Sequence, residues 1–251
     1  MRQKRIFVPT RCVHDWRAFL TDPETQWEPG YSAMSVAYSW ENAGGLPEEI
    51  AHLFEHSGDP ELHPATLVLA IPEYKVSLKG GPRPSQNDVL AVLSTNAGLV
   101  VMSVEAKARE DFDKTLGQWR KETSDKGYKS RLGQILECIG LKSIPPDETR
   151  YQLLHRTASA VLEAQRFHAR VAVMVVQSFV DSDKNNHFAD YKAFLRLYSQ
   201  SAVKNRLIYL ADVGGIRLFS GWVQSKLDYT ERKISPNKLL QRIGAKNRTS
   251  R

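Results

Sequence analysis

Two apolar runs joined by a short turn constrain the fold of this chain more than any other feature. Residues 88–94 and 99–107 are rich in strand-forming side chains, and the sequence Thr-Asn-Ala-Gly connects them. This pattern predicts a β-hairpin. With Asn96–Ala97 as the loop, Asp88 at the start of one strand lies beside Glu105 at the end of the next. Another loop length would move the pairing by about one residue, and a bulge would decide which face Asp88 takes.

The second strand of this hairpin has one apolar face and one face that ends in charge. Side chains alternate across a strand, so Glu105 and Lys107 project from the same side, roughly 6–7 Å apart. The other side is the predicted core face, and it carries Val100, Met102, Val104 and Ala106. The charged end is therefore either a solvated strand end with a weak ion pair or one half of a chemical site.

The rest of the chain predicts an α/β protein with a mixed sheet. Residues 171–179 begin with six consecutive apolar residues, a pattern typical of a strand buried on both faces. The order is a helix, three strands, a helical crossover and a fourth strand, followed by an extra helix and a hairpin. The expected helices are residues 31–43, 47–56, 132–139, 149–169 and 187–198, and the other expected strands are 66–76, 205–213 and 216–223.

Positive charge is concentrated at the C-terminal end. The formal net charge is +7, and residues 226–251 contain eight basic and two acidic residues, which gives +6. We therefore expect one domain over residues 1–225 and a basic tail over residues 226–251. Such a tail suits a polyanion such as nucleic acid, or it serves as a solvated segment that aids solubility.

Composition also limits the compartment. No stretch approaches the ~18 consecutive apolar residues of a membrane span, and the N-terminal residues lack the apolar region of a secretory signal. The two cysteines, Cys12 and Cys138, are far apart in the sequence and suit inert thiols in a reducing environment. These features predict a cytoplasmic protein without a membrane partner.

Asp88, Glu105 and Lys107 together suggest metal chemistry. Two neighbouring carboxylates repel each other unless a cation lies between them. Oxygen ligands favour Mg²⁺ or Mn²⁺ over zinc, and Mg²⁺ commonly uses only one or two carboxylates. A water on such a metal can attack a phosphodiester. Lys107 would orient or deprotonate that water, or neutralise charge on the phosphate oxygens.

These residues resemble a known motif. Asp88, followed after sixteen residues by Glu105-Ala106-Lys107, is similar to the PD-(D/E)XK motif of restriction-endonuclease-like nucleases. The resemblance covers roughly residues 31–180 and extends to an uncharacterised bacterial branch of that superfamily. It implies an αβββαβ core and Mg²⁺-dependent cleavage of DNA. It also implies that Asp88, Glu105 and the Ala106 carbonyl hold the metal and that Lys107 is the catalytic base or charge stabiliser.

The resemblance implies further site residues on two helices. Many members carry another acid on the first helix, for which Glu41 is the candidate. The rival acids on the next helix are Glu48, Glu49 and Glu55. Some members place a glutamine and an aromatic or basic residue on the helix after the third strand, and here Gln152 with Arg156 one turn later corresponds.

Near the first acid the sequence departs from the family pattern. Asn87 replaces the proline that often precedes that acid, and this residue is not a ligand. Three neighbours of Asp88 either contact a phosphate or hold the loop, and they are Arg83, Ser85 and Gln86.

Two other functions compete with the nuclease. One is a nuclease-like fold that binds nucleic acid without cleaving it, which the basic tail suits equally well. The other is a zinc peptidase, because His52-x-x-Glu55-His56 matches an inverted zinc-peptidase pattern. A homodimer is compatible with the nuclease hypothesis, since cutting both strands of a duplex is simplest with two sites.

Overall fold

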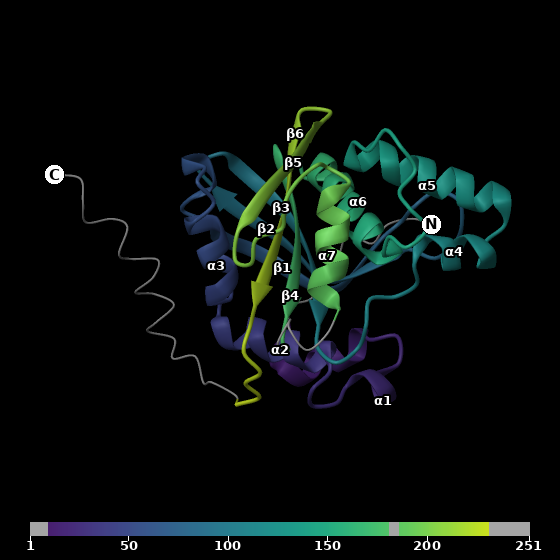
Figure 1. The fold of residues 1–251 in the computed structure, drawn as a ribbon. Helices are drawn as coiled ribbons and strands as arrows, with labels where there is room; N and C mark the ends of the chain where they lie inside the picture. The colour runs from purple at the N-terminus through teal and green to yellow at the C-terminus, as the bar shows by residue number, and fades with distance from the viewer. Residues whose placement is uncertain (1–9, 181–185, 231–251) are drawn as a thin grey trace.

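A six-stranded mixed sheet runs through the middle of the computed structural model, which describes residues 10–180 and 186–230 (Figure 1). The strand order is β1-β2-β3-β4-β6-β5. The first three strands are antiparallel to one another, β3, β4 and β6 are mutually parallel, and β5 returns antiparallel to β6. The strands are β1 (Thr66–Val76), β2 (Ser85–Thr95), β3 (Gly98–Lys107), β4 (Val171–Ser178), β5 (Leu207–Val213) and β6 (Ile216–Gln224).

Helices cover both faces of this sheet. The helices α2 and α3 lie on one side of it, and α4, α5, α6 and α7 lie on the other (Figure 1). The α-helices are α1 (Pro23–Gln26), α2 (Ser32–Ala43), α3 (Glu48–Glu55), α4 (Leu116–Glu122), α5 (Asp125–Ile139), α6 (Tyr151–Arg166) and α7 (His187–Arg196), and two 3₁₀ helices are η1 (Val13–Phe19) and η2 (Pro60–Leu62). The α/β class and the mixed sheet expected from the sequence are confirmed.

The hairpin between β2 and β3 has the expected register. Thr95 pairs with Gly98, and the ladder continues in step to Val89 opposite Val104. Gly98 has a φ of +94°, a conformation that glycine adopts without the penalty of a Cβ atom. Asp88 on β2 and Glu105 on β3 come directly after the last pair of this ladder, Val89 with Val104, so the two acids lie on neighbouring strands at the same end of the hairpin.

The strand β4, whose first six residues are apolar, lies in the centre of the sheet, as its composition predicts. All eight of its residues are buried, and it connects β3 to β6 through two parallel ladders. Because β3 and β4 run in the same direction and β2 runs opposite, one edge of the sheet gathers the end of β3, the end of β4 and the start of β2. The candidate site lies at this edge.

Some helices were missed or shortened by the sequence prediction. The helix α5 begins at Asp125 rather than near residue 132, because its first turns are polar and lack an apolar stripe. The short helix α4 begins at Leu116, directly after Thr115, whose side chain and that of Gln118 form a capping box. That box is a local signal that the predicted elements omitted.

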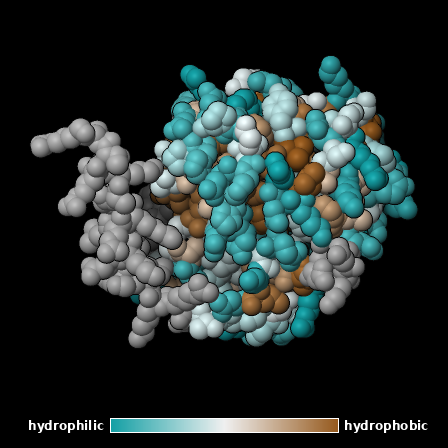
Figure 2. All heavy atoms as spheres, turned by 60° about the vertical axis from the view of Figure 1, so that its left-hand side comes forward, coloured by the Kyte–Doolittle hydropathy of each residue, from teal (hydrophilic) through white to brown (hydrophobic). Residues whose placement is uncertain are grey.

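Apolar side chains form one core on each side of the sheet. The face shown in Figure 2 is mainly hydrophilic, with hydrophobic patches between the polar side chains. Within the described ranges, no helix is long and apolar enough to cross a membrane. Residues 231–251, most of the predicted basic tail, lie outside the described residues.

Candidate functional site

The strands β1 and β2 each contain one extra residue at the same place. Leu90 and Ser85 both face α6, although residues five apart on a regular strand face opposite sides. Pro72 pairs with Val89 and Tyr74 pairs with Asn87, so one residue of each strand lies between these two pairs. These residues are Glu73, whose φ is +50°, and Asp88. This irregularity, which both strands share without a change of register, therefore sets the direction of Asp88 and places Glu73 across from it.

Glu105 is held between two cations. Its carboxylate forms an ion pair with Lys107 Nζ at 2.7 Å and accepts a hydrogen bond from Arg156 Nε at 2.6 Å. Glu105 is 1% exposed, Lys107 is 4% exposed and Arg156 is 6% exposed, so water screens these contacts little. Arg156 comes from α6, which crosses the same face of the sheet.

Asp88 contacts the backbone of the next strand. Its Oδ2 accepts a hydrogen bond from the Ala106 N–H at 2.6 Å. In a strand, the N–H and the C=O of one residue point toward the same neighbouring strand. The Ala106 carbonyl is therefore on the side of β2 and of Asp88.

Burial and charge set the protonation of this group. Burial, reinforced by the charges of Glu105 and Glu73, raises the pKa of Asp88 well above its usual value. Burial would also raise the pKa of Glu105, but the charges of Lys107 and Arg156 outweigh it and lower that pKa. Burial raises the pKa of Glu73 to about 7, against the opposing hydrogen bond from Gln86.

Glu73 is a site residue that sequence reasoning missed. Gln86 Nε2 donates to its carboxylate at 2.6 Å, and Thr21 Oγ1 donates to Gln86 Oε1 at 3.2 Å. The only sequence signal was Pro72 directly before it, which interrupts an otherwise regular strand pattern. Gln86 thus holds structure around the site rather than facing outward.

Ser85 and His155 support Arg156 from the other side. Arg156 Nη1 donates to Ser85 Oγ at 3.0 Å, and Ser85 Oγ lies 2.8 Å from His155 Nδ1. Burial, with the positive charge of Arg156, lowers the pKa of His155 well below its usual value, so this imidazole is neutral near pH 7. The arrangement fixes the Arg156 guanidinium against Glu105.

The group as a whole has an excess of negative charge. Three carboxylates, those of Glu73, Asp88 and Glu105, stand against the two cations Lys107 and Arg156, which leaves one negative charge when all are ionised. A divalent cation would relieve the repulsion that raises the pKa of Asp88. No set of three or more His, Cys, Asp or Glu side chains that could hold a metal occurs in the described part of the chain. The donors that the sequence motif names are Asp88, Glu105 and the Ala106 carbonyl, a number that Mg²⁺ accepts with waters as its other ligands.

Glu41 lies apart from this group. Its Oε1 accepts hydrogen bonds from Trp16 Nε1 at 2.7 Å and from Thr10 Oγ1 at 2.6 Å, which tie the N-terminal segment to α2. The helix α2 packs against the opposite face of the sheet from α6. Of the rival acids on α3, Glu48 and Glu55 are exposed and Glu49 is half-buried.

Gln152 faces a loop and not the carboxylates. Its Oε1 accepts from the Asp113 N–H at 3.1 Å, which holds the segment that follows β3. Arg156, one turn further along α6, is the residue of this pair that reaches Glu105.

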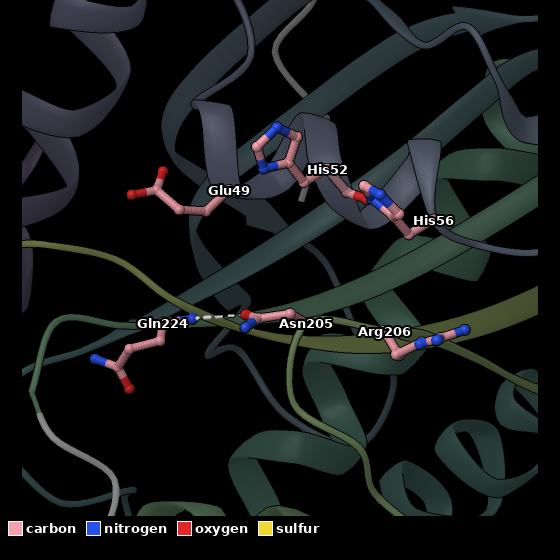
Figure 3. A pocket seen from close by; sticks show the side chains of 6 residues that line it. All are labelled: Glu49, His52, His56, Asn205, Arg206 and Gln224. Carbon is pink, nitrogen blue, oxygen red and sulfur yellow. Dashed lines mark hydrogen bonds between the residues drawn. The ribbon is translucent and has the colours of Figure 1, made fainter.

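The histidines of the peptidase pattern line a separate cavity of about 380 Å³ between α3, the start of β5 and the end of β6. Figure 3 shows that the two rings and the Glu49 carboxylate do not converge on one point. His56 Nδ1 lies 3.0 Å from the His52 carbonyl oxygen, and His52 Nε2 lies 3.9 Å from Glu55 Oε2. In this arrangement one imidazole nitrogen is engaged with backbone, and the pair forms no metal-binding set.

A family comparison covers most of the chain. The model of a domain of unknown function, DUF6946, matches residues 9–227. The chain belongs to the DUF6946 family. The DUF6946 match thus includes Glu73, Asp88, Glu105, Lys107 and Arg156. It also covers the expected domain, residues 1–225, except for the first eight residues. No protein of curated function matches the chain, and no solved structure matches it.

Proposed function

We propose that this protein is a Mg²⁺-dependent nuclease that hydrolyses DNA phosphodiesters and has a restriction-endonuclease-like core. One observation carries the proposal. Asp88 and Glu105 come from adjacent strands to one sheet edge, with Lys107 two residues further on the same face. The order of α2, β1, β2, β3, α6 and β4, with β3 and β4 parallel, supports it because it agrees with the αβββαβ order.

Asp88, Glu105 and the Ala106 carbonyl would hold the metal. When bound there, Mg²⁺ would lower the pKa of a coordinated water and offset phosphate charge. Arg156 keeps Glu105 in place from the α6 side, so Glu105 does not depend on Lys107 alone. Lys107 can therefore turn its ammonium group toward a phosphate oxygen, or orient the attacking water, while Glu105 remains paired.

Purified protein with Mg²⁺ or Mn²⁺ tests the proposal on plasmid, linear duplex and single-stranded DNA. We expect cleavage, and we expect Lys107→Ala, Asp88→Asn and Glu105→Gln to lower its rate by at least about 100-fold. The matched control is Lys142→Ala, which removes an exposed lysine and should cleave like the parent. Circular dichroism melting confirms that each variant folds.

Three outcomes are decisive. Cleavage that survives Lys107→Ala removes Lys107 from the mechanism. Binding of DNA without cleavage by the parent protein favours the silent nucleic-acid-binding alternative. Zinc in untreated protein that His52→Ala releases would support the peptidase alternative instead.

A further inference from the structure

The loop between β1 and β2 carries positive charge at the edge of the sheet where the candidate site lies. From residue 74 to residue 87 the chain has three basic residues, Lys75, Lys79 and Arg83, and no acidic residue. The start of β2 lies beside the end of β3, because these strands are antiparallel. Arg83 precedes Ser85 by two residues, so its Cα lies within about 7 Å of the Cα of a residue that bonds Arg156.

The backbone of this loop is fastened to α5. Arg131 Nε donates to the Lys79 carbonyl at 2.9 Å, and Arg131 Nη2 donates to the Gly81 carbonyl at 3.0 Å. The Lys79 N–H donates to Gln134 Oε1 at 2.6 Å. Arg131 is 7% exposed, so the carbonyls of the loop satisfy a buried cation.

Gly80 shows how closely the loop approaches the helix. A Cβ atom built on it would lie 2.5 Å from the Gly127 carbonyl oxygen and 2.8 Å from the Arg131 nitrogen. Its φ of +78° also favours glycine. Close packing and the hydrogen bonds with Arg131 and Gln134 therefore hold the backbone of an otherwise exposed loop in one conformation.

The side chains of Lys79 and Arg83 differ from many exposed cations of this protein. Both are exposed, and within residues 10–180 and 186–230 neither forms a hydrogen bond or an ion pair through its side chain. Other exposed basic side chains pair with acids, as in Arg17–Glu24, Lys114–Glu122 and Arg120–Asp147. Unpaired cations on a fixed backbone contact phosphates at a low cost in conformational entropy.

From this we infer that the loop formed by residues 78–84 is a preorganised phosphate-contact surface, which binds the backbone of a nucleic acid next to the carboxylate site through Lys79 and Arg83. The inference rests on the proposed function for its choice of polyanion. It extends that function by assigning non-specific backbone contacts to one named loop. Such contacts give affinity and register without reading sequence.

Salt-dependent binding of a short DNA duplex tests this inference. Binding is measured by fluorescence anisotropy in Ca²⁺ instead of Mg²⁺, so that affinity is read apart from cleavage. The logarithm of the association constant falls linearly with the logarithm of the salt concentration. Each of Lys79→Ala and Arg83→Ala should make this negative slope shallower by about 0.9, and the double variant should make it shallower by about 1.8. The loss should be the same for duplexes of unrelated sequence.

Lys142→Ala is the matched control, because Lys142 is also exposed and lies beyond the opposite end of α5. It should leave the slope unchanged. Gly80→Ala adds a test of the fixed backbone: it displaces the loop from α5 while keeping both cations, so affinity should fall although the charge is the same.

The result identifies which proposal fails. Any of three results overturns the loop inference: the double variant has the parental slope, Lys142→Ala changes the slope as much as the loop variants do, or the parent protein binds no DNA. Cleavage by the parent with an unchanged slope in the double variant overturns the loop inference alone. A reduced slope without any cleavage overturns the nuclease and leaves the loop as a phosphate-binding surface.

Discussion

Among the residues of the candidate site, we expect Arg156 to contribute most to the stability of the folded state. It is buried and bonds both Glu105 and Ser85, so Arg156→Met leaves a buried carboxylate with one cation in place of two. We expect a loss of about 3 kcal/mol in the free energy of unfolding, measured by urea denaturation. Arg120→Met removes an exposed partner of Asp147 and should cost less than about 1 kcal/mol. Equal losses for the two variants would contradict the buried role of Arg156.

Tyr74 gives the molecule a dependence on alkaline pH. Burial, with the negative charge of Glu163 beside it, raises the pKa of the Tyr74 hydroxyl to about 12 from an ordinary 10.0. The folded state therefore holds this proton more tightly than the unfolded chain. The stabilisation is complete below pH 10 and is lost as pH rises from 10 toward 12.

Tyr74→Phe isolates this effect. Urea denaturation at pH 9 and pH 11.5 should show a steeper loss of stability in the parent than in Tyr74→Phe. Buried Tyr191 and Tyr198, whose pKa values burial also raises, keep their contributions in both proteins, so only the difference between the proteins counts. Parallel pH profiles would show that the Tyr74 proton is not linked to folding.

At the scale of elements, the β2–β3 turn depends on one glycine. Gly98 has a φ of +94°, and a Cβ atom there would meet nothing within 4 Å. Gly98→Ala should therefore destabilise by about 1 kcal/mol through backbone strain alone. The ladder from Val89 to Thr95 keeps the register, so the proposed DNA cleavage should be unchanged.

Gly133→Ala is the control for that prediction, because it should change the free energy of unfolding in the opposite direction. Gly133 lies in the interior of α5, is exposed, and has open space at its Cβ position. Alanine should stabilise this helix by about 1 kcal/mol. Thermal unfolding that moves in the same direction for both variants would refute the assigned strain at Gly98.

Local sequence patterns predicted the hairpin and the central strand, because the turn residues and the apolar runs that define these elements lie within a few positions of one another. Local sequence patterns predicted only part of the candidate site. The sequence names Asp88, Glu105 and Lys107, but the irregularity that directs Asp88 also involves Glu73 on the neighbouring strand, and pairing between strands is non-local. For Glu41 the helix was expected from the sequence, but the spacing of residues could not predict the hydrogen bond that Trp16 donates to its carboxylate.

At the scale of the whole molecule, charge is divided very unevenly along the chain. Residues 231–251 contain seven basic residues and one acidic residue, which is +6 of the total of +7. The remainder of the chain therefore has a formal charge of +1, and several of its exposed cations pair with acids. If DNA is the partner, this segment supplies long-range attraction while the loop at residues 78–84 makes contacts beside the site.

Deleting residues 231–251 separates these two contributions. The deletion should weaken DNA binding at low salt and reduce the salt slope by more than the Lys79→Ala and Arg83→Ala pair does, because it removes more positive charge. A scrambled segment of the same composition should restore binding, since phosphate attraction depends on charge and not on order. Restoration by the native order alone would mean that the segment recognises DNA through specific contacts. Since salt screens charges more than about 10 Å apart at 0.1 M, the deletion and the parent should converge in affinity at high salt, whereas loss of Lys107 should reduce cleavage at every salt concentration.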